Sequence, residues 1–151
     1  MLLDLSNPDE IIVLPGHKRL KLADHALMLT QADAQDAVGA DTGKSYALPP
    51  GGTVQEPLPL ARLIFLEAAD RVQWKPLVGA ERFARLADDH YTQRFYWEAQ
   101  QPLPTTLFAL RARLARQVVM TRLLRPWDAD EFSASVDLAE TEIRNFEKDK
   151  L

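Results

Sequence analysis

The chain has 151 residues, 46% of them apolar and 26% charged, with a net charge of −4, which fits one globular domain and gives no global bias towards nucleic acid. The absence of cysteine excludes disulfides, thiolate catalysis and cysteine-based zinc sites. No apolar run approaches the roughly 18 residues of a membrane span, and residues 1–4 do not resemble a signal peptide, so we expect a soluble cytoplasmic protein.

The first part of the chain shows two short strand patterns around a turn. Residues 11–14 are an apolar run that ends at Pro15-Gly16, and charged and apolar residues alternate over 19–22. These patterns predict a small hairpin. The expected elements that follow are a short helix over 23–29, a polar loop over 30–44 and a short strand over 45–48.

Residues 39–45, Gly-Ala-Asp-Thr-Gly-Lys-Ser, almost spell a phosphate-binding loop. That motif has one residue more between its glycines than separates Gly39 from Gly43. A phosphate-binding loop also follows a buried strand and opens a helix, whereas polar residues precede Gly39 and prolines 49 and 50 forbid a helix after Ser45. We interpret the segment as a turn before a short strand.

A proline-rich linker over residues 49–59 leads to the second set of elements. The apolar run 63–66 predicts a buried strand over 60–66, and 72–74 begins another edge strand. The further elements predicted are helices over 80–90, over 91–99 and over 105–116 with Thr105 as N-cap, a strand over 118–124, and a terminal amphipathic helix over 128–148 with Asp128 and Glu131 as a capping box.

The terminal helix has the clearest apolar period in the chain. Its stripe steps by 4, 3, 4 and 3 residues, the spacing of a heptad seam, through Phe132, Val136, Ala139, Ile143 and Phe146. The stripe can dock on the parent sheet or on a neighbouring subunit. Together the elements predict a single α+β domain over residues 1–151, with a small mixed sheet, helices packed on it and a helix-rich C-terminal half.

Histidines and carboxylates give no clear metal site. Asp88, Asp89 and His90 could ligate a metal or transfer protons, but adjacent residues on a helix point to different sides, which favours a solvated helix end. His17 and His25 have no recognisable ligand spacing. We predict no metal site and no catalytic residue.

Arginines form the one basic cluster, at positions 111, 113, 116, 122 and 125. Arginine suits bidentate binding of phosphate or carboxylate, but the first three read as the solvent face of a helix. Arg122 differs because it stands in a predicted strand that is otherwise mostly apolar, and a buried arginine needs an anionic partner. We therefore name Arg122 as a candidate ligand-binding residue, together with Gly43 and Lys44.

Five short motifs follow one another along the chain: Val13–Leu22 with PG-x-x-R-L-x-L, Thr42–Ser45, Glu56–Glu67 with PLPL, Phe108–Leu110 and Val118–Pro126. Their order resembles the C-terminal portion of HPr kinase/phosphorylase-like proteins. The match covers about residues 10 to 140, and Thr121 stands where the family commonly has an aromatic residue.

The resemblance implies a fold related to the ATP-using phosphoenolpyruvate carboxykinases and phosphorylation of a serine on a protein. The family's Walker-type loop, histidine and magnesium-holding acidic residues precede the matched region, so we expect this chain to be catalytically incomplete alone. ATP and magnesium would then enter only with a partner chain. The chain would act with that partner or as a binding or regulatory module.

An alternative is a stand-alone small-molecule or protein-interaction domain with no kinase relationship. Sheet neighbours missing from such a fold would leave an apolar face exposed, and such patches usually mark an interface. In either case we expect a protein partner or self-association, and neither nucleic acid nor a membrane as partner.

Overall fold

A computed structural model describes residues 2–16, 19–39, 42–48, 54–87 and 104–148. Helices and small sheets are mixed along the chain, so the α+β prediction is confirmed. The chain groups into two compact units, Met1–Leu60 and Ala61–Leu151, where we expected one domain over 1–151. The boundary falls directly after the proline-rich segment, and each unit is described below by itself.

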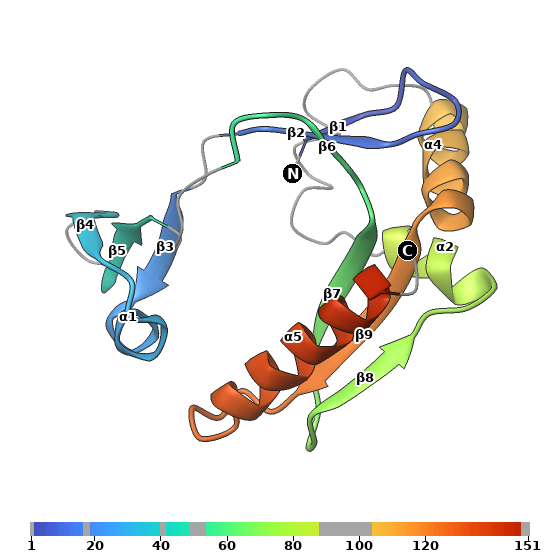
Figure 1. Cartoon of the computed structure of the whole chain (residues 1–151). Coiled ribbons are helices and arrows are strands. Elements are labelled where there is room, and N and C mark those ends of the chain that lie inside the picture. The colour runs from blue at the N-terminus through green and yellow to red at the C-terminus, as the bar shows by residue number, and fades with distance from the viewer. Residues whose placement is uncertain (1, 17–18, 40–41, 49–53, 88–103, 149–151) are drawn as a thin grey trace. The chain divides into compact units, whose positions relative to one another are not determined.

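The first unit contains two antiparallel sheets of three strands each (Figure 1). Their orders are β1-β2-β6 and β3-β5-β4. The elements of this unit are β1 (Leu2–Asp4), β2 (Ile12–Leu14), β3 (Leu20–Ala23), α1 (Asp24–Thr30), β4 (Ala34–Ala37), β5 (Lys44–Ala47) and β6 (Leu58–Pro59).

The predicted hairpin of residues 11–14 and 19–22 does not form. β2 pairs with β1 on one edge and with β6 on the other, so both of its edges are occupied. β3 pairs instead with β5 in the second sheet. Both strand predictions are confirmed, but their partner was wrong because pairing is decided by segments distant in the sequence.

The short helix predicted over residues 23–29 is confirmed as α1, and the strand at 45–48 as β5. The loop predicted over residues 30–44 was partly wrong, because it contains β4. All residues of β4 are exposed and its sequence shows no apolar alternation. It is a strand only because its backbone pairs with β5.

The second unit is built on one mixed sheet with the order β7-β9-β8. β7 runs parallel to β9, and β8 runs antiparallel to it. The elements of this unit are β7 (Arg62–Ala68), β8 (Gln73–Pro76), α2 (Ala80–Ala87), α4 (Pro104–Gln117), β9 (Val119–Arg125) and α5 (Phe132–Lys148).

The three strands predicted in this part, over 60–66, 72–74 and 118–124, are confirmed with shifted ends. The first was wrong as a buried strand, because β7 is an edge strand without a buried residue and its Leu66 is 54% exposed. α2 confirms the start of the helix predicted over 80–90. The helix predicted over 91–99 and the group Asp88-Asp89-His90 lie outside the described residues. Thr105 was wrong as an N-cap because α4 already includes Pro104, whose fixed φ suits a first helical turn.

β9 is the centre of the core of this unit. Met120, Thr121 and Leu123 are at most 5% exposed, and Val118, just before the strand, is 1% exposed. The register places Phe65 beside Arg122 and Ile64 beside Thr121. Since side chains alternate across a strand, Met120 and Arg122 share one sheet face and Thr121 and Leu123 share the other.

The two faces of this sheet carry different helices. α2 lies on the Phe65 face, because the Arg85 guanidinium stands 5.3 Å from the Phe65 ring centroid and Arg82 donates a hydrogen bond to the Val118 carbonyl. α4 packs on α2 through Phe83 and Phe108, whose ring centroids are 4.9 Å apart. α5 contacts β8 and β9 on the opposite face.

Arg62 of β7 lies beneath α5. Its guanidinium is 4.1 Å from the Phe146 ring centroid and 5.4 Å from that of Trp74 on β8. Burial lowers the pKa of Arg62, and the negative charge of Glu142 on α5 opposes that shift. A cation between two rings thus joins the helix to the sheet.

The face of α5 that packs differs from the predicted stripe. Phe132, Ala139 and Phe146 are half-buried as expected, but Val136 and Ile143 are 38% and 40% exposed. The residues turned inwards beside that stripe include Ser135, 2% exposed, and Glu142, half-buried. Ser135 is tolerated there because its hydroxyl donates a 2.7 Å hydrogen bond to the Glu131 carbonyl.

Candidate anion-binding site

Arg122 occupies the middle of the central strand of the second unit, on the face that carries α2. Its side chain is 30% exposed. The only ion pair of Arg122 within the described part of the chain joins its Nη1 to Oε2 of Glu67, on the neighbouring strand β7, over 3.9 Å. This distance is close to the limit for an ion pair, so Glu67 neutralises Arg122 only weakly.

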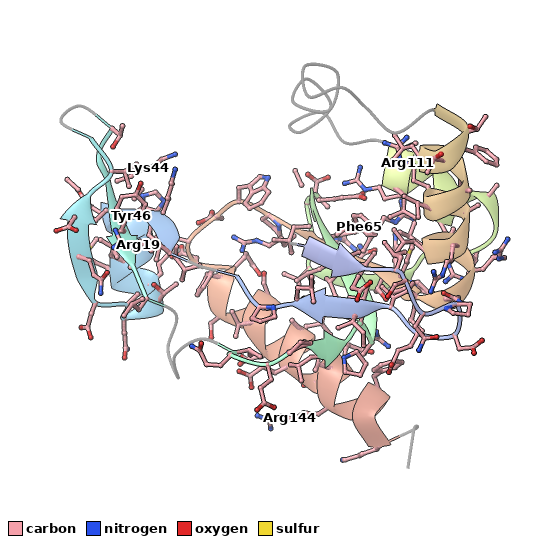
Figure 2. All side chains as sticks on the ribbon, turned by 90° about the horizontal axis from the view of Figure 1, so that it is seen from above. Arg19, Lys44, Tyr46, Phe65, Arg111 and Arg144 are labelled. Carbon is pink, nitrogen blue, oxygen red and sulfur yellow. The ribbon has the colours of Figure 1, made fainter. Side chains whose placement is uncertain are left out.

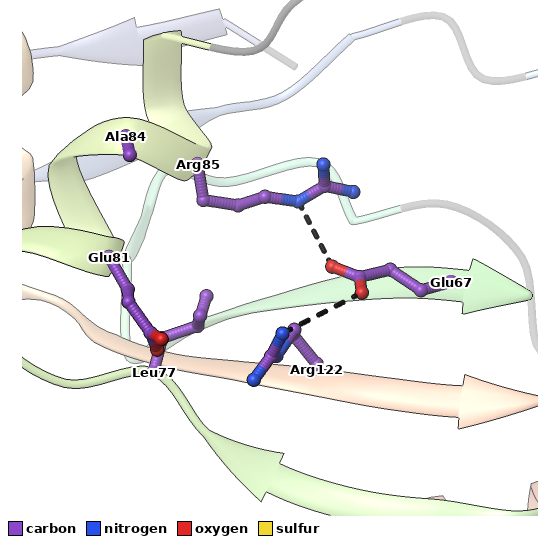
Figure 3. Close-up of a pocket in the computed structure, with 6 residues that line it drawn as sticks. All are labelled: Glu67, Leu77, Glu81, Ala84, Arg85 and Arg122. Atoms are coloured by element: carbon purple, nitrogen blue, oxygen red, sulfur yellow. Dashed lines mark ion pairs between the residues drawn. The ribbon is translucent and has the colours of Figure 1, made fainter. Parts of the chain in front are cut away.

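Glu67 is shared with a second arginine. Oε1 of Glu67 lies 3.2 Å from Nε of Arg85, which α2 places above the sheet. The carboxylate therefore stands between two guanidinium groups that come from a helix and from the central strand (Figure 3). Both arginines and the glutamate are about three-quarters covered, with exposed fractions of 25 to 30%, so the charges interact in a partly desolvated setting.

An open groove of about 430 Å³ runs along this cluster. Apolar atoms of Leu77 and Ala84 form part of its wall, and Glu81 adds a second carboxylate. The groove is lined by Glu67, Leu77, Glu81, Ala84, Arg85 and Arg122. Lys75 of β8 is the register partner of Arg122 on the same sheet face but is not among the residues that line the groove.

One donor of the Arg122 guanidinium has no hydrogen-bond acceptor among the described residues. Its Nε is buried and makes no hydrogen bond to any residue that the structure describes. A buried donor without a partner costs free energy, and the fork of Nε and Nη atoms matches the two oxygens of a carboxylate or phosphate. Arg122 is therefore the candidate donor to an anionic group in this groove, although the two arginines of the lining are matched by two carboxylates, Glu67 and Glu81.

Gly43 and Lys44 lie in the first unit, at the connection between β4 and β5. Gly43 has a φ of 57°, and the Val38 amide donates a 2.9 Å hydrogen bond to the Lys44 carbonyl. The segment that resembled a phosphate-binding loop therefore joins two antiparallel strands and opens no helix. Our interpretation of it as a turn before a short strand is confirmed, and it belongs to a different unit from Arg122.

The arginines predicted as one cluster do not gather at one place. Arg111, labelled in Figure 2, and Arg113 and Arg116 lie on α4, where Arg113 donates to the Gln117 side chain over 2.9 Å. Arg125 is on the sheet face opposite to Arg122, with its guanidinium 4.9 Å from the Trp127 ring centroid. Of these five arginines, Arg122 lines the groove and the other four do not.

Two charged residues of the groove, Glu67 and Arg85, were not predicted from the sequence. Glu67 directly follows the apolar run 63–66, and its parity with Phe65 on the strand could have placed it on the same face. Arg85 lies on a helix, and only tertiary packing brings it to Glu67. Among the described residues, no group of three histidine or carboxylate side chains is close enough to hold a metal ion.

Comparisons with known proteins give no relative. No protein-family model, no curated protein and no solved structure matches this chain. Within the described residues, no helix is long and apolar enough to cross a membrane.

Proposed function

We propose that this chain is an HPr kinase-like binding module, catalytically incomplete alone, that acts with a partner protein in the cytoplasm. In this proposal its groove at Arg122 and Arg85 binds a phosphate or carboxylate group of the ligand. The observation that carries the groove assignment is that Nε of Arg122 is buried and donates no hydrogen bond to a described residue. The nearest carboxylate, that of Glu67, lies 3.9 Å from Nη1 of the same arginine.

The kinase-like part of the proposal rests on the motif segments. The segments over 13–22, 56–67 and 118–126 coincide with β2 and β3, with β6 and β7, and with β9. Catalytic incompleteness follows from what phosphoryl transfer requires, namely a phosphate cradle, a placed magnesium ion and an oriented nucleophile. The segment 39–45 lacks the spacing of a phosphate-binding loop, and its residues 44 and 45 belong to strand β5 and not to a helix.

Ligand binding would proceed by exchange of anions. An incoming phosphate or carboxylate takes the Arg122 fork, and Glu67 keeps its shorter contact of 3.2 Å to Arg85. Arg85 thus remains tethered to β7 while Arg122 changes partner. The apolar atoms of Leu77 and Ala84 would contact the uncharged part of the ligand.

Calorimetric titration with inorganic phosphate tests the groove. We expect the wild-type chain to bind phosphate and Arg122→Gln to lose about tenfold or more in affinity, because a charge-assisted hydrogen bond contributes roughly 1.5–3 kcal/mol. Arg144→Gln is the matched control, since Arg144 pairs only with Glu140 of its own helix at 3.1 Å among the described contacts. Equal phosphate affinity of the wild type and Arg122→Gln would refute the groove as the site.

The kinase-like part is tested separately by co-purification. We expect a partner chain that bears a phosphate-binding loop, and we expect the complex, but not the isolated chain, to transfer phosphate from Mg-ATP to serine. Transfer by the isolated chain would contradict its catalytic incompleteness. A partner without any nucleotide-binding loop would contradict the kinase relationship.

A second candidate is a stand-alone protein-interaction domain with no kinase relationship. The observation in its favour is the flank of α5 where Val136 and Ile143 are 38% and 40% exposed, because exposed apolar side chains on one helix face mark interfaces. The pair Val136→Ser and Ile143→Ser should then abolish partner capture and leave phosphate binding unchanged. Partner capture that persists in this double variant would contradict the second candidate.

A further inference from the structure

One face of the second sheet of the first unit carries an aromatic ring among cations. In the pairing of β3 with β5, Lys21 is opposite Tyr46 and Ala23 is opposite Lys44. Since side chains alternate along a strand, Lys21, Lys44 and Tyr46 share one face of this sheet. Leu20, Leu22 and Ala47 share the other, where Ala47 is fully buried.

The charged groups of this face stand around the Tyr46 ring. The Arg19 guanidinium is 5.2 Å and the Lys21 ammonium 5.7 Å from the ring centroid, and Figure 2 shows Arg19, Lys44 and Tyr46 on this sheet. These contacts hold the two cations close together although they repel each other. We call Arg19, Lys21, Lys44 and Tyr46 the Tyr46 face.

The positive charge of the Tyr46 face is only partly balanced. Its single described ion pair joins Arg19 to Asp36 of β4 at 4.0 Å, and the Asp36 side chain is 85% exposed. No described residue forms an ion pair with Lys21 or Lys44. Three cations and one carboxylate leave this face positive in a chain whose net charge is −4.

We propose that the Tyr46 face binds an oligophosphate group, meaning two or more linked phosphates. The backbone positions of residues two apart on a strand are about 7 Å apart, and those of diagonal neighbours on paired strands about 7–8 Å, so the three cations start from a span that linked phosphates match better than one small anion does. A chain of linked phosphates carries its charges over such a span, and each phosphate meets a different cation.

This site is independent of the Arg122 groove. It lies in the first unit, on β3 and β5, whereas the groove is formed by β7, β9 and α2 of the second unit. It also differs from the phosphate-binding loop that residues 39–45 resemble, because side chains of a sheet face bind the ligand and not the backbone amides of a loop. Lys44 takes part here as a strand residue.

The experiment is a titration of the full chain with inorganic tripolyphosphate in the Arg122→Gln background, which silences the groove. We expect binding that weakens about tenfold for Lys21→Gln and about tenfold for Lys44→Gln, as expected for the loss of one charge-assisted contact each. Arg144→Gln serves as the control and should bind as its parent does. Amide spectra of each variant check that the sheet is retained.

Two further arms define the ligand. Sulfate at equal ionic strength should compete poorly with tripolyphosphate if linked phosphates are needed. A second titration with ATP, without magnesium, tells whether a nucleotide or the inorganic phosphate chain is the preferred ligand. Stronger binding of ATP than of tripolyphosphate assigns a nucleotide, and equal binding assigns the phosphate chain alone. Tripolyphosphate binding that is absent, matched by sulfate, or unchanged in the Lys21→Gln, Lys44→Gln double variant overturns the proposal.

Discussion

Glu67 connects two arginines that reach it from different elements. It lies 3.2 Å from Arg85 on α2 and 3.9 Å from Arg122 on β9. Its charge attaches α2 to the sheet and at the same time occupies the edge of the groove. The same residue therefore stabilises the fold and competes with any anion that approaches Arg122.

We expect Glu67→Gln to tighten phosphate binding in the groove several-fold, because the competing negative charge is removed while the shape is kept. The free energy of unfolding should fall by about 1 kcal/mol, since a partly exposed ion pair contributes little. Phosphate titration and urea unfolding measure the two effects. Weaker phosphate binding in Glu67→Gln would show that Glu67 positions the arginines and does not compete.

At Arg62 packing contributes more than charge, because the side chain lies under α5 and its main neighbours are aromatic rings. Its Nε and Nη1 atoms are buried without a hydrogen bond to a described residue, while Phe146 lies at 4.1 Å and Trp74 at 5.4 Å from the guanidinium. The packing of the side chain under α5 then outweighs its charge.

Arg62→Ala should lower the free energy of unfolding by about 1–3 kcal/mol, because it leaves a gap between α5 and the sheet. Arg62→Met should recover most of that loss, since it refills the gap without burying a charge. Urea unfolding followed by circular dichroism gives both values. If methionine proved as destabilising as alanine, the attraction between Arg62 and Glu142 would be the larger contribution.

The described part of the connection between β4 and β5 contains a glycine in the left-handed conformation. Gly43 has a φ of 57°, and a Cβ added there would meet no atom within 4 Å. Any cost of a side chain at this position is therefore conformational and not steric. Gly43, which suggested a phosphate-binding loop in the sequence, lies directly before β5, the strand that pairs with β4.

We expect Gly43→Ala to destabilise the β4–β5 hairpin by about 1 kcal/mol, because a left-handed conformation disfavours residues with a Cβ. Hydrogen exchange of the amides of β5 should accelerate accordingly. Gly16→Ala is the matched control, since a Cβ there also meets no atom within 4 Å and φ is not left-handed. Equal exchange rates in the two variants would contradict a conformational role for Gly43.

At the scale of the whole molecule, the chain divides after the proline-rich segment. The buried residues of the second unit, Val118, Met120, Thr121 and Leu123, lie on or next to β9, and β9 has β7 and β8 on its two sides. This sheet, with α5 on one face and α2 on the other, takes its strands and helices from the second unit alone.

Residues 61–151 expressed alone should therefore fold cooperatively and bind phosphate with the affinity of the full chain. The sheet, the groove and both of its arginines lie within this segment. Circular dichroism on heating and phosphate titration test the expectation. A segment that stays unfolded would show that the first unit is needed to complete its core.

Particular residues show how far prediction from the sequence extends. The apolar run 63–66 and the mostly apolar segment 118–124 identified β7 and β9, because short apolar stretches bounded by turn residues are typical of strands in a packed sheet. The exposed strand β4 carries no such signal and was missed. On α5 the apolar period predicted a docked helix, but not that Ser135 is buried while Val136 remains 38% exposed.

For the site, the sequence singled out Arg122 because a charge within a mostly apolar strand is costly. It could not supply Glu67 or Arg85, since their meeting depends on where α2 lies on the sheet. Lys44 was named for its place in a loop motif, whereas its neighbours on the Tyr46 face come from the register of β3 with β5.

Local patterning thus determined which segments become helices and strands, since periodic burial and turn residues act over a few neighbouring positions. Tertiary structure alone decided which strands pair, which flank of α5 packs and which charges meet. These outcomes depend on contacts between residues far apart in the chain, such as Glu67 with Arg122 and Lys21 with Tyr46, and local sequence carries no record of them.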